Sequence, residues 1–304
     1  MKNTEPNIKK INSVKELHSL MGLQSPSNPL ITIIDHSKTQ NSNHSQNQKL
    51  LLEFYNITIK RSFKGKLKYG KNTYDFDEGT MSFIAPNQIL SIDSEEEKNN
   101  DGWSLLFHPD LIRKYPFTKT IKNYGFFSYK MNEALHLSDE EEKTIEIIVK
   151  NIQNEINSRF DNFSQDVIVS NLELLLSYSN RFYSRQFLTR KMVSNDLLSN
   201  FENLLEHYFS DNSDLTLPTV EKLANELNVS ASYLSDMLRN VTGQNTQQHI
   251  HSKLIEKAKE ILTTTNFTMS EIAYQLGFEY PQSFSKLFKS KTSLTPLEYR
   301  QTYN

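Results

Sequence analysis

Near its end the chain reads Ile272-Ala273-Tyr274-Gln275-Leu276-Gly277-Phe278, and then Ser283-Phe284-Ser285-Lys286-Leu287-Phe288-Lys289. The apolar residues fall at the spacing of two short helices, each with one buried face. Gly277 stands where the first helix is expected to end in a positive φ. We therefore predict two helices around a glycine turn, with Phe278 filling the angle between them.

The second helix of this pair, at about Pro281–Ser290, leaves a polar face for solvent. That face offers amide, hydroxyl and ammonium groups, which can hydrogen-bond to base edges and phosphates in a DNA major groove. The residues expected on it are Gln282, Ser283, Ser285, Lys286 and Lys289. The pattern predicts a helix-turn-helix whose second helix reads DNA.

A similar unit precedes it. Helical spacing over Leu217–Leu227 leads into a turn at Asn228-Val229, and Ser230 is a good N-cap for the next helix. Gly243 ends this unit. The polar residues expected on its reading helix, at about Ser230–Asn240, are Ser232, Ser235, Asp236 and Arg239.

Both units resemble the DNA-binding domain of the AraC/XylS family of bacterial transcription regulators. The resemblance rests on the Gly277-Phe278 turn, the Phe284-x3-Phe288-Lys289 stretch and the trailing Thr295-Pro296-x2-Tyr299-Arg300. Family members join two such units by one helix, which matches an apolar stripe at about Gln247–Leu262, so the resemblance covers roughly Asp196–Asn304. It implies that both reading helices reach successive major grooves, about 34 Å apart.

The resemblance also implies a role for each polar residue. Base-edge contacts fall to the four residues of the first unit and to Gln282, Ser283, Ser285 and Lys286 of the second, with Lys289 on phosphate. Asp236 departs from the family, which often has a basic or amide residue there, and a carboxylate is repelled by phosphate. Ser293, where the family often has glycine, is a milder departure.

Charge is unevenly distributed over this domain. Residues 194–304 hold nine Lys and Arg against thirteen Asp and Glu, a net charge of −4, yet the part from Pro281 onwards has a net charge of +3. The charged residues of that part are Lys286, Lys289, Lys291, Glu298 and Arg300. Because phosphate attraction depends on the patch that faces the DNA, we expect salt-sensitive binding in which the second unit dominates.

The N-terminal part has a period nearer two between Leu30 and Phe107, with turn residues between short apolar runs, which predicts antiparallel strands. The stretch Tyr74–Asn87 resembles the cupin-like sensor domain of many AraC-type regulators, and Gly102–Pro109 follows the Bacteroidetes-type versions. This resemblance implies a barrel that binds a small-molecule effector or relays a signal. A barrel filled by its own side chains is the alternative.

A helical section follows. Its first helix carries a narrow apolar stripe formed by Ile145, Ile148, Val149, Ile152 and Ile156. Such a stripe is typical of a helix that pairs with another helix, and the family resemblance favours a homodimer contact here. Packing against the chain's own barrel is the equally weighted alternative.

The predicted fold is therefore α+β. It comprises an N-terminal tail (1–20), a cupin-like antiparallel β-barrel (21–125), a helical dimerisation section (126–190), a linker (191–195) and a C-terminal all-α domain with two helix-turn-helix units (196–304).

Composition limits the function. The 304 residues include no cysteine, which excludes disulfides, thiolate metal sites and the nucleophile of alkyltransferases that carry this kind of DNA domain. His36, His44 and His108 lack the spacing of a cupin metal site, and His249 and His251 point to different faces of a helix. We predict no cofactor, no metal and no enzymatic activity.

The predicted function is a cytoplasmic, dimeric DNA-binding transcription regulator without a signal peptide or a membrane span. Its expected partner is double-stranded DNA, with RNA polymerase, a second copy and a small-molecule effector as further candidates. The alternative is a small-molecule-binding cupin-type protein or enzyme whose C-terminal helices form an interaction module.

Overall fold

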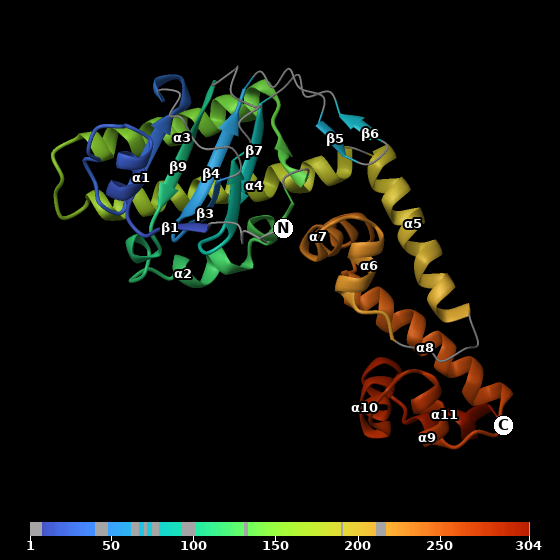
Figure 1. Ribbon diagram of the computed structural model, residues 1–304. Coiled ribbons are helices and arrows are strands. Elements are labelled where there is room, and N and C mark those ends of the chain that lie inside the picture. The colour runs from blue at the N-terminus through green and yellow to red at the C-terminus, as the bar shows by residue number, and fades with distance from the viewer. Residues whose placement is uncertain are drawn as a thin grey trace, which may run out of the picture. The chain divides into compact units, whose positions relative to one another are not determined.

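The computed structural model describes residues 8–39, 48–61, 67–69, 72–74, 79–92, 101–130, 133–189, 191–210 and 217–303. The chain divides into two compact units, Met1–Gln186 and Phe187–Asn304. The N-terminal one of these, Met1–Gln186, contains sheets and helices, and the C-terminal one contains helices, as Figure 1 shows. His44 and the stretch Asp75–Glu78, part of the resemblance over Tyr74–Asn87, lie outside the described residues.

Three antiparallel or mixed sheets account for the strands of the N-terminal unit. The largest has five antiparallel strands, in the order β10 (Leu135–His136), β7 (Thr80–Ile84), β4 (Tyr55–Lys60), β9 (Gly102–Phe107) and β2 (Ile31–Asp35). A second has the order β1 (Ile8–Ile11), β3 (Gln48–Leu52) and β8 (Ile89–Ile92), with β1 parallel to β3. The third pairs β5 (Leu67–Tyr69) with β6 (Asn72–Tyr74).

The five-stranded sheet buries both of its faces. In β4, Ile57 and Ile59 lie on one face and Asn56 on the other, as the two-residue period of a strand requires, and all three are buried. In β9, Leu105 and Leu106 likewise point to opposite faces, and both are buried. The sheet therefore lies between two covering layers.

One covering layer is the three-stranded sheet with helix α1 (Val14–Leu20). Leu106 of β9 and Ile34 of β2 belong to one apolar cluster with residues of that layer. The other members of the cluster are Ile11, Val14, Leu17, Leu50, Leu52 and Phe54. The antiparallel sheets are as expected, but no ladder among the described strands joins the two sheets into a closed barrel.

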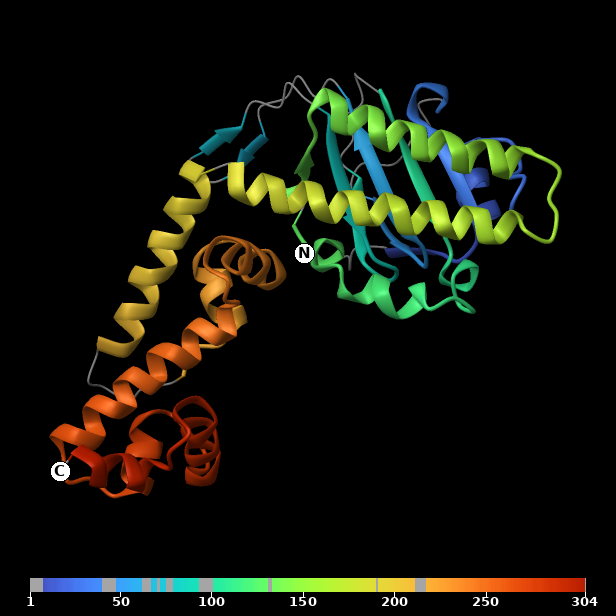
Figure 2. The ribbon, with the colours of Figure 1, turned by 180° about the vertical axis from the view of Figure 1, so that it is seen from behind.

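The second covering layer is a pair of long helices, α3 (Asp139–Asn157) and α4 (Ser164–Thr189), which lie across the five-stranded sheet in Figure 2. Helix α3 begins with a capping box between Ser138 and Glu141. Short helical turns precede it, namely α2 (Phe117–Thr120) and the 3-10 turns Pro109–Leu111, Ile121–Asn123 and Gly125–Ser128.

The apolar stripe of α3 is part of this core. Ile145, Ile148, Val149, Ile152 and Ile156 are between 0% and 6% exposed. Their apolar surface is covered by the same chain, as in the alternative of packing within one chain, so it is not exposed for the predicted dimer contact. The stripe is narrow because only one side of α3 faces the sheet.

The C-terminal unit is built from seven helices among the described residues. They are α5 (Lys191–Ser210), α6 (Val220–Glu226), α7 (Ala231–Thr242), α8 (Thr246–Thr264), α9 (Met269–Gln275), α10 (Pro281–Thr292) and α11 (Pro296–Tyr303). The expected linker at 191–195 is instead the beginning of α5. Ser194 is buried there, and its hydroxyl donates a 2.9 Å hydrogen bond to the carbonyl oxygen of Phe187.

Helix α8 is the predicted long connection between the helix-turn-helix units, and its apolar face is buried as expected. The buried apolar residues are Ile250, Leu254, Ile255, Ala258, Ile261 and Leu262. Within the part of the chain that the structure describes, no helix combines the length and apolar character of a bilayer-spanning segment.

Candidate nucleic-acid interface

Helices α6 and α7 form the first unit, and α9 and α10 form the second. Each turn contains one residue of positive φ, Asn228 at 60° in the first unit and Gly277 at 81° in the second. The next backbone N–H then returns to the first helix, from Val229 to Ala224 at 3.0 Å and from Phe278 to Ala273 at 2.9 Å. The positive φ predicted for Gly277 is confirmed, and the two turns share one hydrogen-bond pattern.

The two reading helices can be aligned residue by residue. The second turn is one residue longer than the first, so each position of α7 matches the position fifty residues later in α10. The ends of the helices support this alignment, because Thr242 and Thr292 donate equivalent hydroxyl hydrogen bonds of 2.8 Å to Leu238 and Phe288. Gly243 and Ser293 then end the helices with φ of 80° and 66°.

Caps determine where the reading helices begin. Ser230 is the N-cap of α7, as predicted, and its hydroxyl accepts a 3.1 Å hydrogen bond from the backbone of Tyr233. Helix α10 has no such side-chain cap and begins with Pro281, whose missing N–H needs no acceptor at that position. Phe278 contacts Phe284 with the ring centroids 5.6 Å apart, so it fills the angle between α9 and α10 as expected.

The structure exposes most of the predicted reading residues. On α10, Gln282, Ser283, Lys286 and Lys289 are exposed to solvent. On α7, Arg239 is exposed, and Ser232 and Asp236 are partly exposed.

Two predicted contacts have other partners. The hydroxyl of Ser235 lies 3.0 Å from the hydroxyl of Thr246, which is fully buried at the beginning of α8. At the matched position of α10, the hydroxyl of Ser285 donates to the carbonyl oxygen of Pro281 at 3.1 Å. Both side chains are partly buried, so the structure assigns these two serines contacts within the domain.

The charge at one matched position is reversed between the helices. Asp236 of α7 corresponds to Lys286 of α10, as Arg239 corresponds to Lys289. Asp236 Oδ1 accepts a 2.9 Å hydrogen bond from Arg239 Nη1 one turn further along the helix. The first helix thus presents a neutral ion pair where the second presents two ammonium groups.

Arg300, which the sequence analysis counted with the basic patch, is docked inside the domain. Its Nε donates a 3.1 Å hydrogen bond to the carbonyl oxygen of Leu262, in the last turn of α8. That turn carries unpaired carbonyls and the negative end of the helix dipole, which a guanidinium stabilises. The exposed basic charge of the second unit therefore comes from its lysines.

The histidine pair on α8 has local partners. The Nε2 atom of His249 lies 2.8 Å from the hydroxyl of Thr242, and that of His251 lies 2.8 Å from the side-chain amide of Gln247. Burial lowers the pKa of both imidazoles. Among the described residues, no three His, Cys, Asp or Glu side chains gather as a metal site would require.

The N-terminal unit contains a hollow between its two packed sheets that the sequence analysis missed. Its volume is about 120 Å³, and half of its lining residues are leucines from α1, β3 and β9. A chain of hydrogen bonds lies along one side, from His36 Nε2 to Ser104 Oγ at 2.8 Å and from Ser104 to Thr58 at 2.7 Å. Thr58 donates to Asn56 at 3.1 Å, and burial lowers the pKa of His36.

The alternation of polar residues in β4 and β9 was visible in the sequence, but the face to which it points was not. Asn56 and Thr58 are two residues apart and therefore share a face. Only the packing of the second sheet makes that face an interior one.

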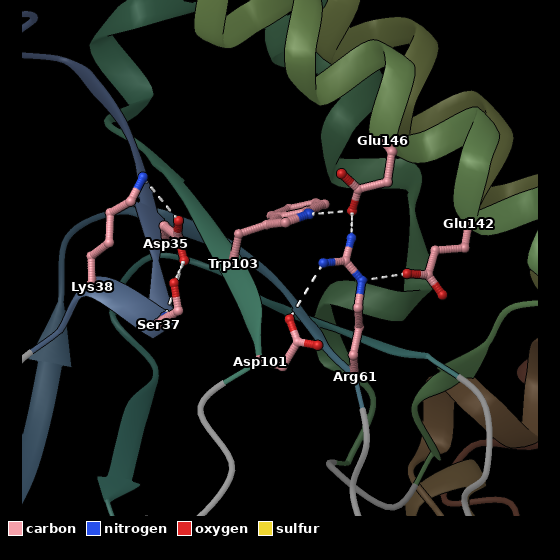
Figure 3. Close-up of polar contacts among 8 residues, drawn as sticks. All are labelled: Asp35, Ser37, Lys38, Arg61, Asp101, Trp103, Glu142 and Glu146. Carbon is pink, nitrogen blue, oxygen red and sulfur yellow. Dashed lines mark hydrogen bonds and ion pairs between the residues drawn. The ribbon is translucent and has the colours of Figure 1, made fainter.

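An open polar cleft of about 1200 Å³ lies on the helical side of the same sheet, beside β2, β9 and α3. In Figure 3, Arg61 at the end of β4 reaches Glu142 and Glu146 of α3, and also Asp101 at 3.5 Å. The indole of Trp103 donates a 2.7 Å hydrogen bond to Glu146. These side chains of the sheet and of α3 pair with one another, and the pairs hold α3 against the sheet.

Comparisons with known proteins concern mainly the C-terminal unit. A family model described as a helix-turn-helix domain matches residues 223–302. The uncharacterized HTH-type transcriptional regulator YisR of Bacillus subtilis is 35% identical over 83 residues, which cover 27% of this chain and 29% of YisR. Histidine kinase P4 of Formosa agariphila is 26% identical over 141 residues, 46% of this chain and 10% of the kinase.

A solved structure gives a similar match. The C-terminal domain of the two-component response regulator yesN from Fusobacterium nucleatum is 35% identical, with 33% of this chain and 93% of that chain covered and a TM-score of 0.30. This chain thus spans less than a third of the two sequence relatives named above, whose other parts it does not match. From residue 223 to residue 302, the chain carries a helix-turn-helix domain similar to that of HTH-type transcriptional regulators.

Proposed function

We propose that this chain is a sequence-specific transcription regulator that inserts α7 and α10 into successive segments of the DNA major groove. The observation that carries the proposal is the pair of helix-turn-helix units that share one turn geometry and one hydrogen-bond pattern at the end of the second helix. Helix α8 has 19 residues and is therefore about 28 Å long, close to the length of one DNA turn.

The exposed polar residues of both helices make the proposed contacts. Ser232 and Arg239 reach base edges from α7, with Asp236 paired to Arg239, and Gln282, Ser283 and Lys286 do so from α10. An amide pairs well with adenine and an ammonium with guanine, which suits Gln282 and Lys286. Lys289, near the end of α10, contacts phosphate.

Selection of bound duplexes from a random pool at near-physiological salt tests this function. We expect two short sequence blocks about ten base pairs apart, one for each unit. Recovery of no motif, with only salt-dependent bulk binding, would contradict sequence-specific reading by the free protein.

We further propose that the N-terminal unit is a cupin-like sensor and that the hollow beside His36 holds its effector. A hollow of about 120 Å³ accepts only a small molecule, and its leucine walls with one polar side favour a compact amphipathic one. A thermal-shift screen of small alcohols, acids and amides should find a stabilising compound. The variant Leu106→Trp, which fills the hollow, should abolish that shift; an unchanged shift would place the compound elsewhere.

The proposed homodimer needs a surface other than the buried stripe of α3. Phe160 and Phe163, which follow α3, are 53% and 71% exposed, and Leu174 of α4 is 46% exposed. Sedimentation of the full chain and of Phe163→Ser measures the oligomeric state. A monomeric parent at micromolar concentration would remove the dimer from the proposal.

A further inference from the structure

Helix α7 carries an ion pair between two residues of its exposed polar face. Asp236 and Arg239 are one helical turn apart, with Oδ1 and Nη1 2.9 Å from each other. The side chain of Asp236 is 26% exposed and that of Arg239 is 55% exposed, so the arginine is the more accessible of the two. Both residues lie on a helix that the proposed function places in the major groove.

Arginine reads guanine by donating two hydrogen bonds, to O6 and N7. Its side chain is long and loses conformational freedom when it is held in one orientation. A carboxylate bound to one nitrogen restricts the guanidinium in advance and leaves other N–H groups for the base. The free-energy cost of ordering the side chain is then partly met before DNA binds.

A phosphate contact is the alternative role for Arg239. The carboxylate three residues earlier makes this unfavourable, because it cancels the attraction of the guanidinium and repels the phosphate itself. Lys289, at the matched position of α10, has a lysine and not an aspartate three residues before it. The two positions therefore differ in what they can contact.

We propose that Asp236 is a positioning residue that orients Arg239 for a two-bond contact with a guanine, so that the first unit reads that base. This inference rests on the proposed DNA-reading function and deepens it. Asp236, the residue that departs from the family pattern, thereby contributes to specificity through its neighbour.

The test selects bound duplexes with the full chain and with Asp236→Asn, Arg239→Lys and Glu260→Gln. The parent motif should contain a fixed guanine in the block read by α7. Asp236→Asn and Arg239→Lys should each lower the preference for that guanine about tenfold and leave the α10 block unchanged. The double variant Asp236→Asn, Arg239→Lys should lose no more of the guanine preference than either single variant, because the two residues act together.

Glu260→Gln is the matched control. It removes the same charge from another pair with three-residue spacing, Lys257 and Glu260 of α8, whose Nζ and Oε2 are 3.1 Å apart. Its motif should equal that of the parent. Far-UV circular dichroism of each variant checks that the fold is retained, since both sites are solvent-accessible.

The salt dependence of DNA affinity distinguishes a phosphate contact by Lys289 from a base contact by Arg239. Lys289→Gln should reduce the slope of log affinity against log salt by about 1, and Arg239→Gln should leave the slope unchanged. An Asp236→Asn variant that keeps the full guanine preference, a parent block without guanine, or an equal slope loss in Arg239→Gln would overturn the inference. Failure of the proposed function itself is a different result, the absence of any motif for the parent.

Discussion

The two helix-turn-helix units have the same backbone but differ in where glycine stands. Each unit has one positive-φ position in its turn and one at the end of its second helix, and glycine occupies a different one in each. In the first unit, Asn228 occupies the positive-φ position of the turn and Gly243 that of the helix end. In the second unit, Gly277 occupies the turn and Ser293 the helix end. Each unit thus tolerates one non-glycine residue in a strained conformation, which costs about 1–2 kcal/mol. The comparison teaches that the helix-turn-helix backbone requires a positive φ at these positions, and that Gly, Asn or Ser can adopt it.

The reading faces differ more than the frames do. Asp236 and Lys286 lie at matched positions with opposite charges, although Leu238 and Phe288 two residues later are both fully buried. Core positions must preserve packing, whereas an exposed position is free to change its chemistry. The two units can therefore be the same fold and still contact DNA in different ways.

The largest expected effect concerns the shared frame. Leu238→Ala and Phe288→Ala each remove a fully buried side chain, which should lower the free energy of unfolding by about 2–5 and 3–5 kcal/mol. If α8 makes the two units one cooperative domain, urea unfolding followed by circular dichroism should show one transition that either variant shifts. Separate transitions for the two units would break the comparison at the level of stability.

The next effect concerns the reading face. Lys286→Ala should weaken specific DNA binding by about 1–3 kcal/mol and relax one base position in the α10 block. Lys291→Ala, at an exposed lysine near the end of α10, serves as control and should weaken binding to all sequences alike. Competition binding with point-mutated operators distinguishes the two results. Full affinity and selectivity of Lys286→Ala would mean that α10 is wrongly placed in the groove.

Exchanging the helix-end residues should give shifts of opposite sign. Ser293→Gly should raise the free energy of unfolding by about 1 kcal/mol or less, and Gly243→Ser should lower it by about 1 kcal/mol. A Cβ atom at Gly243 would meet no neighbour within 4 Å, so the effect there comes from the backbone alone. Equal signs for the two variants, measured by thermal unfolding, would show that the helix ends are not equivalent.

The smallest effect concerns pH and the glutamates that take part in capping the N-termini of α9 and α11. Hydrogen bonds with Thr268 and Thr295 hold the pKa of Glu271 and Glu298 below the ordinary 4.5. Their stabilisation is therefore present above pH 4.5 and is lost as the pH falls through the lowered pKa. The cap after the first unit pairs Asn245 with a neutral glutamine and does not titrate.

The double variant Glu271→Gln, Glu298→Gln should accordingly show a smaller drop of the thermal midpoint between pH 7 and pH 3.5 than the parent. Unfolding should be followed in the C-terminal unit by its amide exchange, because other carboxylates of the chain also titrate in this range. An equal drop in both proteins would mean that the caps contribute no pH dependence.

Much of the C-terminal unit could be predicted from residues that act locally. The N-cap at Ser230, the positive φ at Gly277, the helix end at Gly243 and the apolar face of α8 depend on neighbours within a few positions. Such features follow from steric limits and hydrogen-bond needs of a short stretch of backbone.

Other features needed partners far away in the chain. Ser235 looked exposed by helical spacing, yet its hydroxyl meets Thr246 of the next helix. Arg300 looked like a DNA-binding cation, yet it donates to Leu262 at the end of α8. Spacing indicates which side of a helix a residue occupies, but not what lies opposite that side.

The sequence by itself determined the helix-turn-helix frames and their exposed polar faces, because caps, turns and helical periodicity act over a few residues. The tertiary structure alone decided that the isoleucine stripe of α3 covers the chain's own sheet, and that His36 meets Ser104, 68 residues away, in an interior hollow. An apolar stripe can be covered by any apolar surface of matching shape, and a strand's polar side has no inside until another sheet packs on it. Those decisions therefore belong to the packing of distant segments.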